Sequence, residues 1–149
     1  MFNFSSRELA IQYAGILSNI QEILESREFY WDLTEIKSFW NSEDDGARVY
    51  AKLADAWSYP ATVKPMGLKR FKPWYRRVTA ETKGKVIELN PKFMNRDHAD
   101  QANTLVHEWL HTRGYGHIYN NRTKHPIILK SVPYVVGNLV ETLYRKNYE

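Results

Sequence analysis

Cysteine is absent from the 149 residues of this chain. The chain therefore forms no disulfide bonds, which is compatible with a reducing compartment such as the cytoplasm. Apolar runs approaching 18 residues are also lacking, so we expect no membrane-spanning helix. Residues 1–8 show no basic region followed by an apolar core and do not look like a signal peptide. We expect a cytoplasmic protein, with export by a leaderless route as the alternative.

Acidic side chains are missing from residues 64–77, although the net charge of the whole chain is only +4. Six basic residues lie in this segment: Lys64, Lys69, Arg70, Lys72, Arg76 and Arg77. Aromatic side chains are interleaved with them, a pattern that can bind nucleic acid or an acidic partner. The segment contains no recognised nucleic-acid motif, which favours an ordinary solvated strand and loop with its aromatic rings turned inward.

The remaining composition is that of a globular protein. Apolar residues make up 43% of the chain and aromatic residues 14%, which is enough to form a core without disulfides. At this length we expect one domain over residues 1–149. The sequence shows no internal repeat, linker or low-complexity segment.

One segment of the sequence indicates a chemistry. Residues 107–117 read HEWLHTRGYGH. His107 and His111 are four residues apart, a spacing that puts both on one face of an α-helix, where two imidazoles can bind one metal ion. Glu108 would then project beside the metal, where its carboxylate can hold a water molecule and accept its proton.

The third histidine of this segment follows a glycine. Gly114 can adopt a positive φ and end the helix, so that the chain turns sharply and brings His117 back as a third ligand. Three neutral histidines suit zinc and leave one tetrahedral position for a water molecule with a pKa of about 7. Structural zinc sites are closed by a fourth ligand, so we expect a catalytic zinc ion. The alternative is a buried helix whose histidines are satisfied by hydrogen bonds.

The segment 107–117 resembles the metzincin signature of zinc peptidases, H-E-x-x-H-x-x-G-x-x-H, at every fixed position. The match covers 11 of the 149 residues. The resemblance implies that His107, His111 and His117 bind zinc and that Glu108 is the general base and acid. It also implies that the reaction is hydrolysis of a peptide bond.

Metzincins have a methionine in a tight turn beneath the zinc, whereas all three methionines of this chain lie upstream of the motif. The segment Ser131-Val132-Pro133-Tyr134 resembles the family's Ser-Ile-Met-x-Tyr turn without its methionine. It can also be the beginning of the last helix, with Ser131 as cap and Pro133 in the first turn, and both interpretations can hold together. In some metzincins a nearby tyrosine stabilises the oxyanion, which suggests Tyr134 for this role. The alternative is a plain core tyrosine.

Another family of zinc peptidases offers a different third ligand. In gluzincins this ligand is a glutamate on a later helix, and Glu141 lies 30 residues after His111. The spacing of Gly114 and His117 favours His117 instead. Glu141 then lies either behind the ligands or on a solvated helix face.

Helices are predicted at both ends of the chain and over the motif. Helical spacing of apolar residues predicts four of them, at about residues 6–27, 43–57, 97–112 and 133–146. Ser5 and Glu8 form a capping box for the first helix, and Asp97 caps the helix that carries the motif. Residues 118–130 are expected to form an irregular connection.

The segments richest in β-forming residues lie between the second and third helices. Strands are predicted at 61–64, 74–80 and 85–89, with a hairpin turn at Thr82-Lys83-Gly84. The order of elements predicts an α+β fold that resembles a pared-down zincin: a small mixed or antiparallel sheet packed on an active-site helix, with N-terminal and C-terminal helices. In that family one strand pairs with extended substrate, and here we expect this strand in the 74–89 hairpin, at 74–80.

These residues together predict a zinc-dependent endopeptidase that acts on peptides or proteins, with a zinc-bound water activated by Glu108. Two other functions stay open. One is a zinc-containing binding or regulatory protein with little peptidase activity, and the other is a nucleic-acid-associated protease targeted by residues 64–77. His98 and His125 lie outside the motif and are expected at the surface. Asn103, four residues before His107, can lie behind the ligands.

Overall fold

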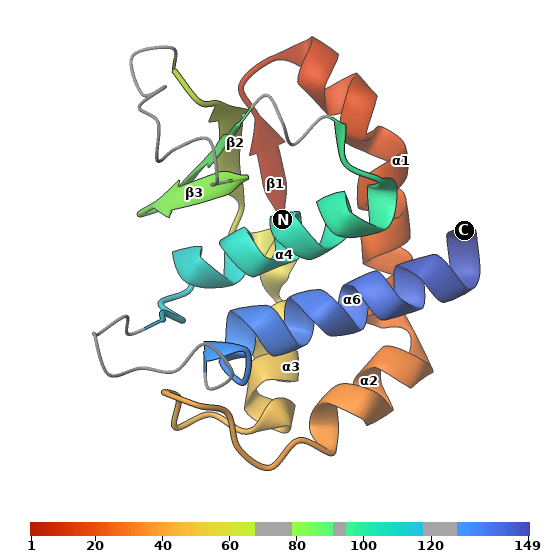
Figure 1. Ribbon diagram of the computed structural model, residues 1–149, viewed down its shortest axis with the longest axis vertical. Coiled ribbons are helices and arrows are strands. Elements are labelled where there is room, and N and C mark those ends of the chain that lie inside the picture. The colour runs from red at the N-terminus through yellow and green to blue at the C-terminus, as the bar shows by residue number, and fades with distance from the viewer. Residues whose placement is uncertain (68–78, 91–94, 118–127) are drawn as a thin grey trace.

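The computed structural model describes residues 1–67, 79–90, 95–117 and 128–149. In these segments the chain forms five α-helices and a four-stranded mixed sheet, so the predicted α+β class is confirmed. The elements in chain order are β1 (Phe2–Phe4), α1 (Arg7–Glu25), α2 (Arg27–Thr34), α3 (Gly46–Ala54), a 3-10 helix (Ala56–Ser58), β2 (Ala61–Pro65), β3 (Ala80–Lys83), β4 (Val86–Leu89), α4 (His98–Thr112) and α6 (Val132–Tyr148). Figure 1 shows α4 and α6 side by side, with the sheet on one side of this pair and α2 and α3 on the other.

The strand order of the sheet is β1-β2-β4-β3. The pairs β1–β2 and β2–β4 are parallel, whereas β3 is antiparallel to β4 and forms an edge of the sheet that the described residues make. The strand at 61–64 is confirmed as β2. We did not predict β1, because three residues are too few to show a period in the sequence; it forms because β2 supplies its hydrogen-bonding partners, beginning with Phe2 opposite Ala61.

The predicted hairpin turn was one to two residues too early. Thr82 and Lys83 belong to β3, and the turn is at Gly84 and Lys85, because Lys83 pairs with Val86 across the hairpin. The strand that we expect to pair with substrate corresponds, among the described residues, to β3 at 80–83. Residues 74–78 of the predicted strand lie outside the described residues. This correction moves Thr82 from a solvent-exposed turn to the strand that borders α4.

The first helix also differs from the prediction at both of its ends. Ser5 donates its backbone N–H to the Val63 carbonyl at 2.8 Å and so continues the sheet, which leaves Ser6 as the cap. The Ser6 hydroxyl accepts a hydrogen bond from the N–H of Leu9 at 3.3 Å. At the other end, the Ser26 hydroxyl accepts from the N–H of Phe29 and donates to the Ile23 carbonyl. One serine thus ends α1 and begins α2, a helix that we did not predict.

The second predicted helix, 43–57, is shorter in the structure. Asp45 caps α3 by accepting a hydrogen bond from the N–H of Arg48 at 2.9 Å, and the helix ends at Ala54. A separate 3-10 turn follows at Ala56–Ser58. Local capping by Asp45 outweighs the apolar spacing that suggested a longer helix.

The central pair of helices carries the core and positions the site. Asp97 caps α4 as predicted, accepting from the N–H of Asp100 at 2.8 Å. The apolar residues on the inner faces of both helices are buried: Ala99, Ala102, Val106, Trp109 and Leu110 on α4, and Val136, Val140, Leu143 and Tyr144 on α6. The helices approach closely at Gly137, where an added Cβ would lie 2.3 Å from Oδ1 of Asn103. This contact fixes α6 against the helix that bears the motif.

Several predictions fall on residues that the structure does not describe. They include the connection at 118–127, His125, and every basic residue of 64–77 except Lys64. Lys64 forms an ion pair with Glu88, with Nζ 3.2 Å from Oε1. None of the described helices is long and apolar enough to cross a membrane.

Candidate metal centre and cleft

His107 and His111 project from one face of α4, as their spacing predicts. Their ring centroids are 4.9 Å apart. The opposite face of the helix is buried in the core, which leaves the histidine face toward a cleft of about 1010 Å3. The residues that line it are Ala80, Glu81, Thr82, Gly84, Lys85, His107, Glu108, His111, Thr112, Gly114, Tyr115, Gly116, His117 and Tyr134.

The turn after α4 brings the third histidine back to the other two. Gly114 has a φ of +91°, a conformation that residues with a side chain rarely adopt. Its N–H donates to the His111 carbonyl at 3.1 Å, and the N–H of Tyr115 donates to the Leu110 carbonyl at 3.3 Å. These hydrogen bonds end α4, and the chain then turns back toward the histidines.

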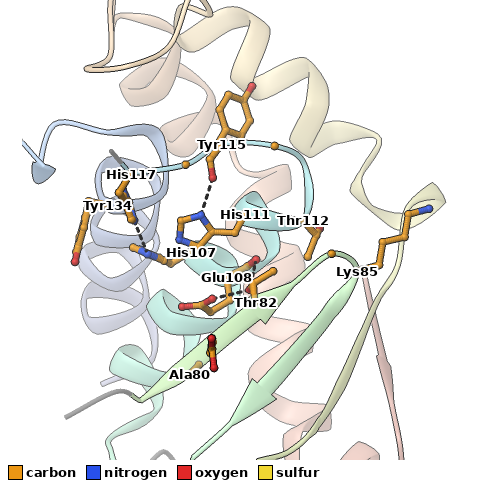
Figure 2. A pocket seen from close by; sticks show the side chains of 14 residues that line it. Ala80, Thr82, Lys85, His107, Glu108, His111, Thr112, Tyr115, His117 and Tyr134 are labelled. Carbon is orange, nitrogen blue, oxygen red and sulfur yellow. Dashed lines mark hydrogen bonds between the residues drawn. The ribbon is translucent and has the colours of Figure 1, made fainter. Parts of the chain in front are cut away.

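The three histidines form a compact set of nitrogen donors. One potential ligand atom from each of His107, His111 and His117 lies within 4.8 Å of the others. The Nε2 atoms of His107 and His117 are 3.2 Å apart. Figure 2 shows the three rings converging on one point of the cleft. The arrangement can hold a metal ion.

Each imidazole has a hydrogen-bonding partner on its outer side. Nδ1 of His111 is 2.6 Å from the carbonyl oxygen of Tyr115, which can only accept, so Nδ1 carries the proton and Nε2 is free. Nδ1 of His117 is 2.9 Å from the Ser131 hydroxyl. His107 bonds to the backbone of Pro133; since proline has no N–H, the partner is the carbonyl. Such outer partners fix the tautomer and orientation of metal-binding histidines.

Electrostatics favour the neutral form of the His107 and His117 rings. Burial, together with the nearby His111 and His117, lowers the pKa of His107 to about 3. Burial and His111 lower the pKa of His117 to about 4. Both are therefore neutral at pH 7 and have a lone pair available for a metal.

The segment Ser131–Tyr134 lies directly against two of the histidines. Ser131 is fully buried, and its hydroxyl does not cap α6 as predicted but bonds to His117 instead. The Tyr134 ring centroid is 4.7 Å from that of His107 and 4.8 Å from that of His117. Pro133 stands in the first turn of α6, as predicted. The segment thus supplies two hydrogen-bonding groups and an aromatic ring at one side of the site.

Glu108 projects into the cleft beside the histidines and contacts the edge strand. The Thr82 hydroxyl is 2.6 Å from Oε2 of Glu108 and 3.0 Å from its backbone carbonyl oxygen. Burial raises the pKa of the Glu108 carboxyl, while the hydrogen bond from Thr82 and the nearby His111 act in the opposite direction. A carboxyl group with a raised pKa is suited to both accept and donate a proton near neutral pH.

Tyr115 connects the turn after α4 to the start of α3. Its hydroxyl donates to Oδ2 of Asp44 at 2.6 Å, and Nζ of Lys52 donates to the same oxygen at 2.6 Å. Burial and the bond to Asp44 raise the pKa of Tyr115 to about 12, while the bond from Lys52 is the largest of the causes that lower the pKa of Asp44. The Tyr115 carbonyl accepts a hydrogen bond from His111. The bond between Tyr115 and Asp44 therefore helps to hold His111 in its orientation.

Sequence reasoning missed the roles of Thr82, Ser131 and Tyr115. Ser131 belongs to the segment that resembles the metzincin turn, but its hydrogen bond to His117 joins residues 14 positions apart, and the sequence between them shows no pattern. Thr82 is 26 residues from Glu108, and nothing in the sequence signals their contact.

Glu141 does not belong to the histidine group. Its Oε2 accepts a hydrogen bond from Asn103 at 2.7 Å, and its Oε1 accepts from Arg145. Asn103 is also 3.1 Å from Asn138, so its hydrogen bonds are made with α6. The geometry therefore favours His117 over Glu141 as the third donor. His98 is exposed, as predicted.

Comparisons of the chain with protein-family models, with curated proteins and with solved structures each returned no match.

Proposed function

We propose that this protein is a zinc-dependent endopeptidase with a zincin-like catalytic domain. The observation that carries the proposal is the convergence of three imidazoles and the Glu108 carboxyl in one cleft, beside the edge strand β3. A buried structural histidine cluster would need no such cleft and no neighbouring carboxylate.

The donor set fits zinc. Three imidazole nitrogens, each with an outer hydrogen bond, match the ligands of catalytic zinc sites, and the chain has no cysteine to close the site as a structural one. When bound, zinc would polarise the substrate carbonyl and make a water molecule more acidic. His107, His111 and His117 would hold it.

Glu108 would move the proton of the reaction. As a base it accepts a proton from the attacking water, whose oxygen forms a bond to the scissile carbonyl carbon. As an acid it then gives that proton to the leaving amine as the carbon–nitrogen bond breaks. Its raised pKa and its position beside His107 and His111 support both steps. Thr82 would hold the carboxyl in place through the bond to Oε2.

The edge strand would bind the substrate. In the described sheet β3 pairs only with β4, and Ala80, Glu81 and Thr82 line the cleft. An extended peptide can therefore add as a further strand along β3 and bring a peptide bond near the histidines. This pairing depends on the peptide backbone and so suits an endopeptidase that accepts many sequences.

Tyr134 would stabilise the developing oxyanion. Its ring packs on His107 and His117, and its hydroxyl has no hydrogen-bond partner among the residues that the structure describes. A free phenol group at the border of the cleft can donate to a negatively charged oxygen. The segment Ser131–Tyr134 would also take the supporting place that the methionine turn has in metzincins, through hydrogen bonds and an aromatic ring instead of a thioether.

The proposal is tested by the variant Glu108→Gln. Because the ligands are unchanged, it should bind one zinc ion per chain, while cleavage of a broad peptide mixture falls by a factor of about 10² to 10⁴, the usual contribution of acid–base catalysis. Glu141→Gln is the matched control and should keep both zinc and cleavage. Undiminished cleavage by Glu108→Gln contradicts the mechanism. Zinc binding without any cleavage by the unchanged protein would instead indicate a binding or regulatory protein.

A further inference from the structure

A smaller cavity, of about 170 Å3, shares part of its lining with the metal cleft. Its lining comes from three segments: Ser58, Tyr59 and Pro60 before β2, Lys85 in the hairpin turn, and Thr112 and Arg113 at the end of α4. Lys85 and Thr112 also line the metal cleft. Figure 2 shows both at the end of the cleft opposite Tyr134. A peptide in the cleft can therefore reach this cavity.

The cavity carries two positive charges and no negative charge. Lys85 and Arg113 are the only ionisable cations in its lining, and none of the ion pairs among the described residues involves either of them. The segments outside the described residues, 68–78, 91–94 and 118–127, contain no aspartate or glutamate. Among the described residues, no carboxylate therefore forms an ion pair with Lys85 or Arg113.

Arg113 is held in one orientation by aromatic rings. Its guanidinium carbon lies 4.1 Å from the centre of the Tyr59 ring and 5.9 Å from that of Trp109. The Trp109 indole N–H donates to the Tyr59 carbonyl at 3.1 Å, which fixes the two aromatic residues to each other. Nε of Arg113 is buried without a hydrogen-bond partner in the described part of the chain. Stacking covers the faces of a guanidinium and leaves its edge for hydrogen bonds to a planar anion.

We propose that Lys85 and Arg113 form a subsite for a carboxylate of the peptide substrate. This inference rests on the proposed peptidase function and adds a preference for acidic peptides to it. A carboxylate matches the planar edge of Arg113, and Lys85, which lines both this cavity and the metal cleft, adds a second positive charge. The cavity accommodates a group of the size of an aspartate or glutamate side chain or a chain terminus.

The carboxylate can belong to a side chain or to the C-terminus of the peptide, and paired peptides distinguish these sources. We suggest taking a peptide that the zinc-loaded protein cleaves and replacing each residue near the cleaved bond in turn by Glu and by Gln. Each peptide is made with a free and with an amidated C-terminus. For a side-chain carboxylate, Glu at one position should raise kcat/KM about fivefold to tenfold over Gln. For a terminal carboxylate, amidation should lower kcat/KM by the same factor.

Charge reversal identifies the residues that are responsible. Lys85 is exposed in a turn, so Lys85→Glu should fold normally; it should abolish the preference for Glu and favour a peptide with Lys at the same position. Arg113→Gln should also abolish the preference. Lys37→Glu makes the same change of net charge at an exposed residue that lines neither cavity, and should keep the preference. Equal kcat/KM for Glu and Gln at every position, with no effect of amidation, overturns the proposal, as does a preference that persists in Lys85→Glu.

A binding measurement separates this proposal from the proposed function. Fluorescently labelled Glu and Gln peptides are titrated with zinc-loaded Glu108→Gln protein and with its Lys85→Glu double variant. Tighter binding of the Glu peptide that is lost in the double variant supports the subsite, even if the unchanged protein cleaves nothing and the peptidase function fails. Cleavage without any discrimination between the peptides leaves the peptidase function standing and overturns the subsite.

Discussion

The hydroxyl of Ser131 lies 2.9 Å from Nδ1 of His117. This contact joins the first residue before α6 to the last histidine of the motif, and it explains why the serine does not cap its own helix. It also holds the His117 ring with Nε2 3.2 Å from Nε2 of His107, where both nitrogens can bind one ion. The beginning of α6 is thus part of the metal centre.

Removing this hydroxyl should weaken metal binding more than it weakens the fold. Ser131→Ala removes the hydrogen bond between the serine hydroxyl and Nδ1 of His117, and losses of this kind typically lower metal affinity by about 10-fold to 100-fold. Competition with a chelator of known affinity measures the change. Ser38→Ala, at an exposed serine, should leave the affinity unchanged. Equal affinities for Ser131→Ala and the unchanged protein would show that the contact does not orient His117.

Adding a methyl group at Gly137 should displace the Asn103 side chain and disturb its hydrogen bonds to α6. Its Cβ would lie 2.3 Å from Oδ1 of Asn103, so we expect Gly137→Ala to lower the free energy of unfolding by about 1–3 kcal/mol. Urea denaturation measures this change. Gly15→Ala is the control: Gly15 lies inside α1 with nothing within 4 Å of the added Cβ, and the substitution should stabilise the protein by about 0.5–1 kcal/mol.

The hydrogen bond from Tyr115 to Asp44, which anchors the turn after α4, should contribute measurably to the free energy of unfolding. Tyr115→Phe removes the hydrogen bond to the Asp44 carboxylate, and bonds to charged groups contribute about 1.5–3 kcal/mol. Because Asp44 keeps its bond to Lys52 and remains partly exposed, we expect a loss near the lower end of this range. Urea denaturation of Tyr115→Phe and of the unchanged protein measures this loss. Tyr30→Phe, at an exposed tyrosine of α2, is the control and should change little.

The metal-free protein should become less stable as the pH falls. In the folded state the pKa of His107 is lowered to about 3 and that of His117 to about 4, from the usual value of 6.5. Between these values and 6.5, the unfolded chain binds protons that the folded chain does not, so the free energy of unfolding decreases with decreasing pH. This contribution to the free energy of unfolding is fully present above about pH 6.5 and is lost as the pH falls through the folded-state pKa values of about 4 for His117 and about 3 for His107.

Thermal unfolding in the presence of a chelator, repeated across this pH range, tests the prediction. His117→Asn removes one of the two groups and should flatten the dependence on pH. His98→Asn removes an exposed histidine and should not. A melting temperature that stays constant from pH 7 to pH 4.5 in the unchanged protein would contradict the prediction.

Features that depend on neighbouring residues could be predicted from the sequence. The cap at Asp97, the facing positions of His107 and His111, and the turn at Gly114 all follow from interactions within a few residues. The capping serines show the limit of this reasoning, because Ser5 and Ser6 offer the same side chain. A backbone bond from Ser5 to Val63, far away in the sequence, decides between them.

Contacts between distant segments could not be predicted in the same way. Thr82 meets Glu108 only because β3 begins two residues before Thr82 and pairs with β4 in one particular register. Tyr115 meets Asp44 across 71 residues, and neither residue belongs to a pattern. The histidines of the site were therefore predictable from their spacing, whereas most of the residues that orient them and Glu108 were not.

Zinc titration of the metal-free protein tests the central claim most directly. The protein is stripped with a chelator, zinc is added in steps, and cleavage of a peptide mixture is measured together with the bound metal. If His107, His111 and His117 hold the catalytic ion, cleavage should be absent at first, rise in proportion to bound zinc and reach a plateau at one ion per chain. Cleavage that is unaffected by removing zinc, or full zinc loading with no cleavage at any stage, would contradict the account.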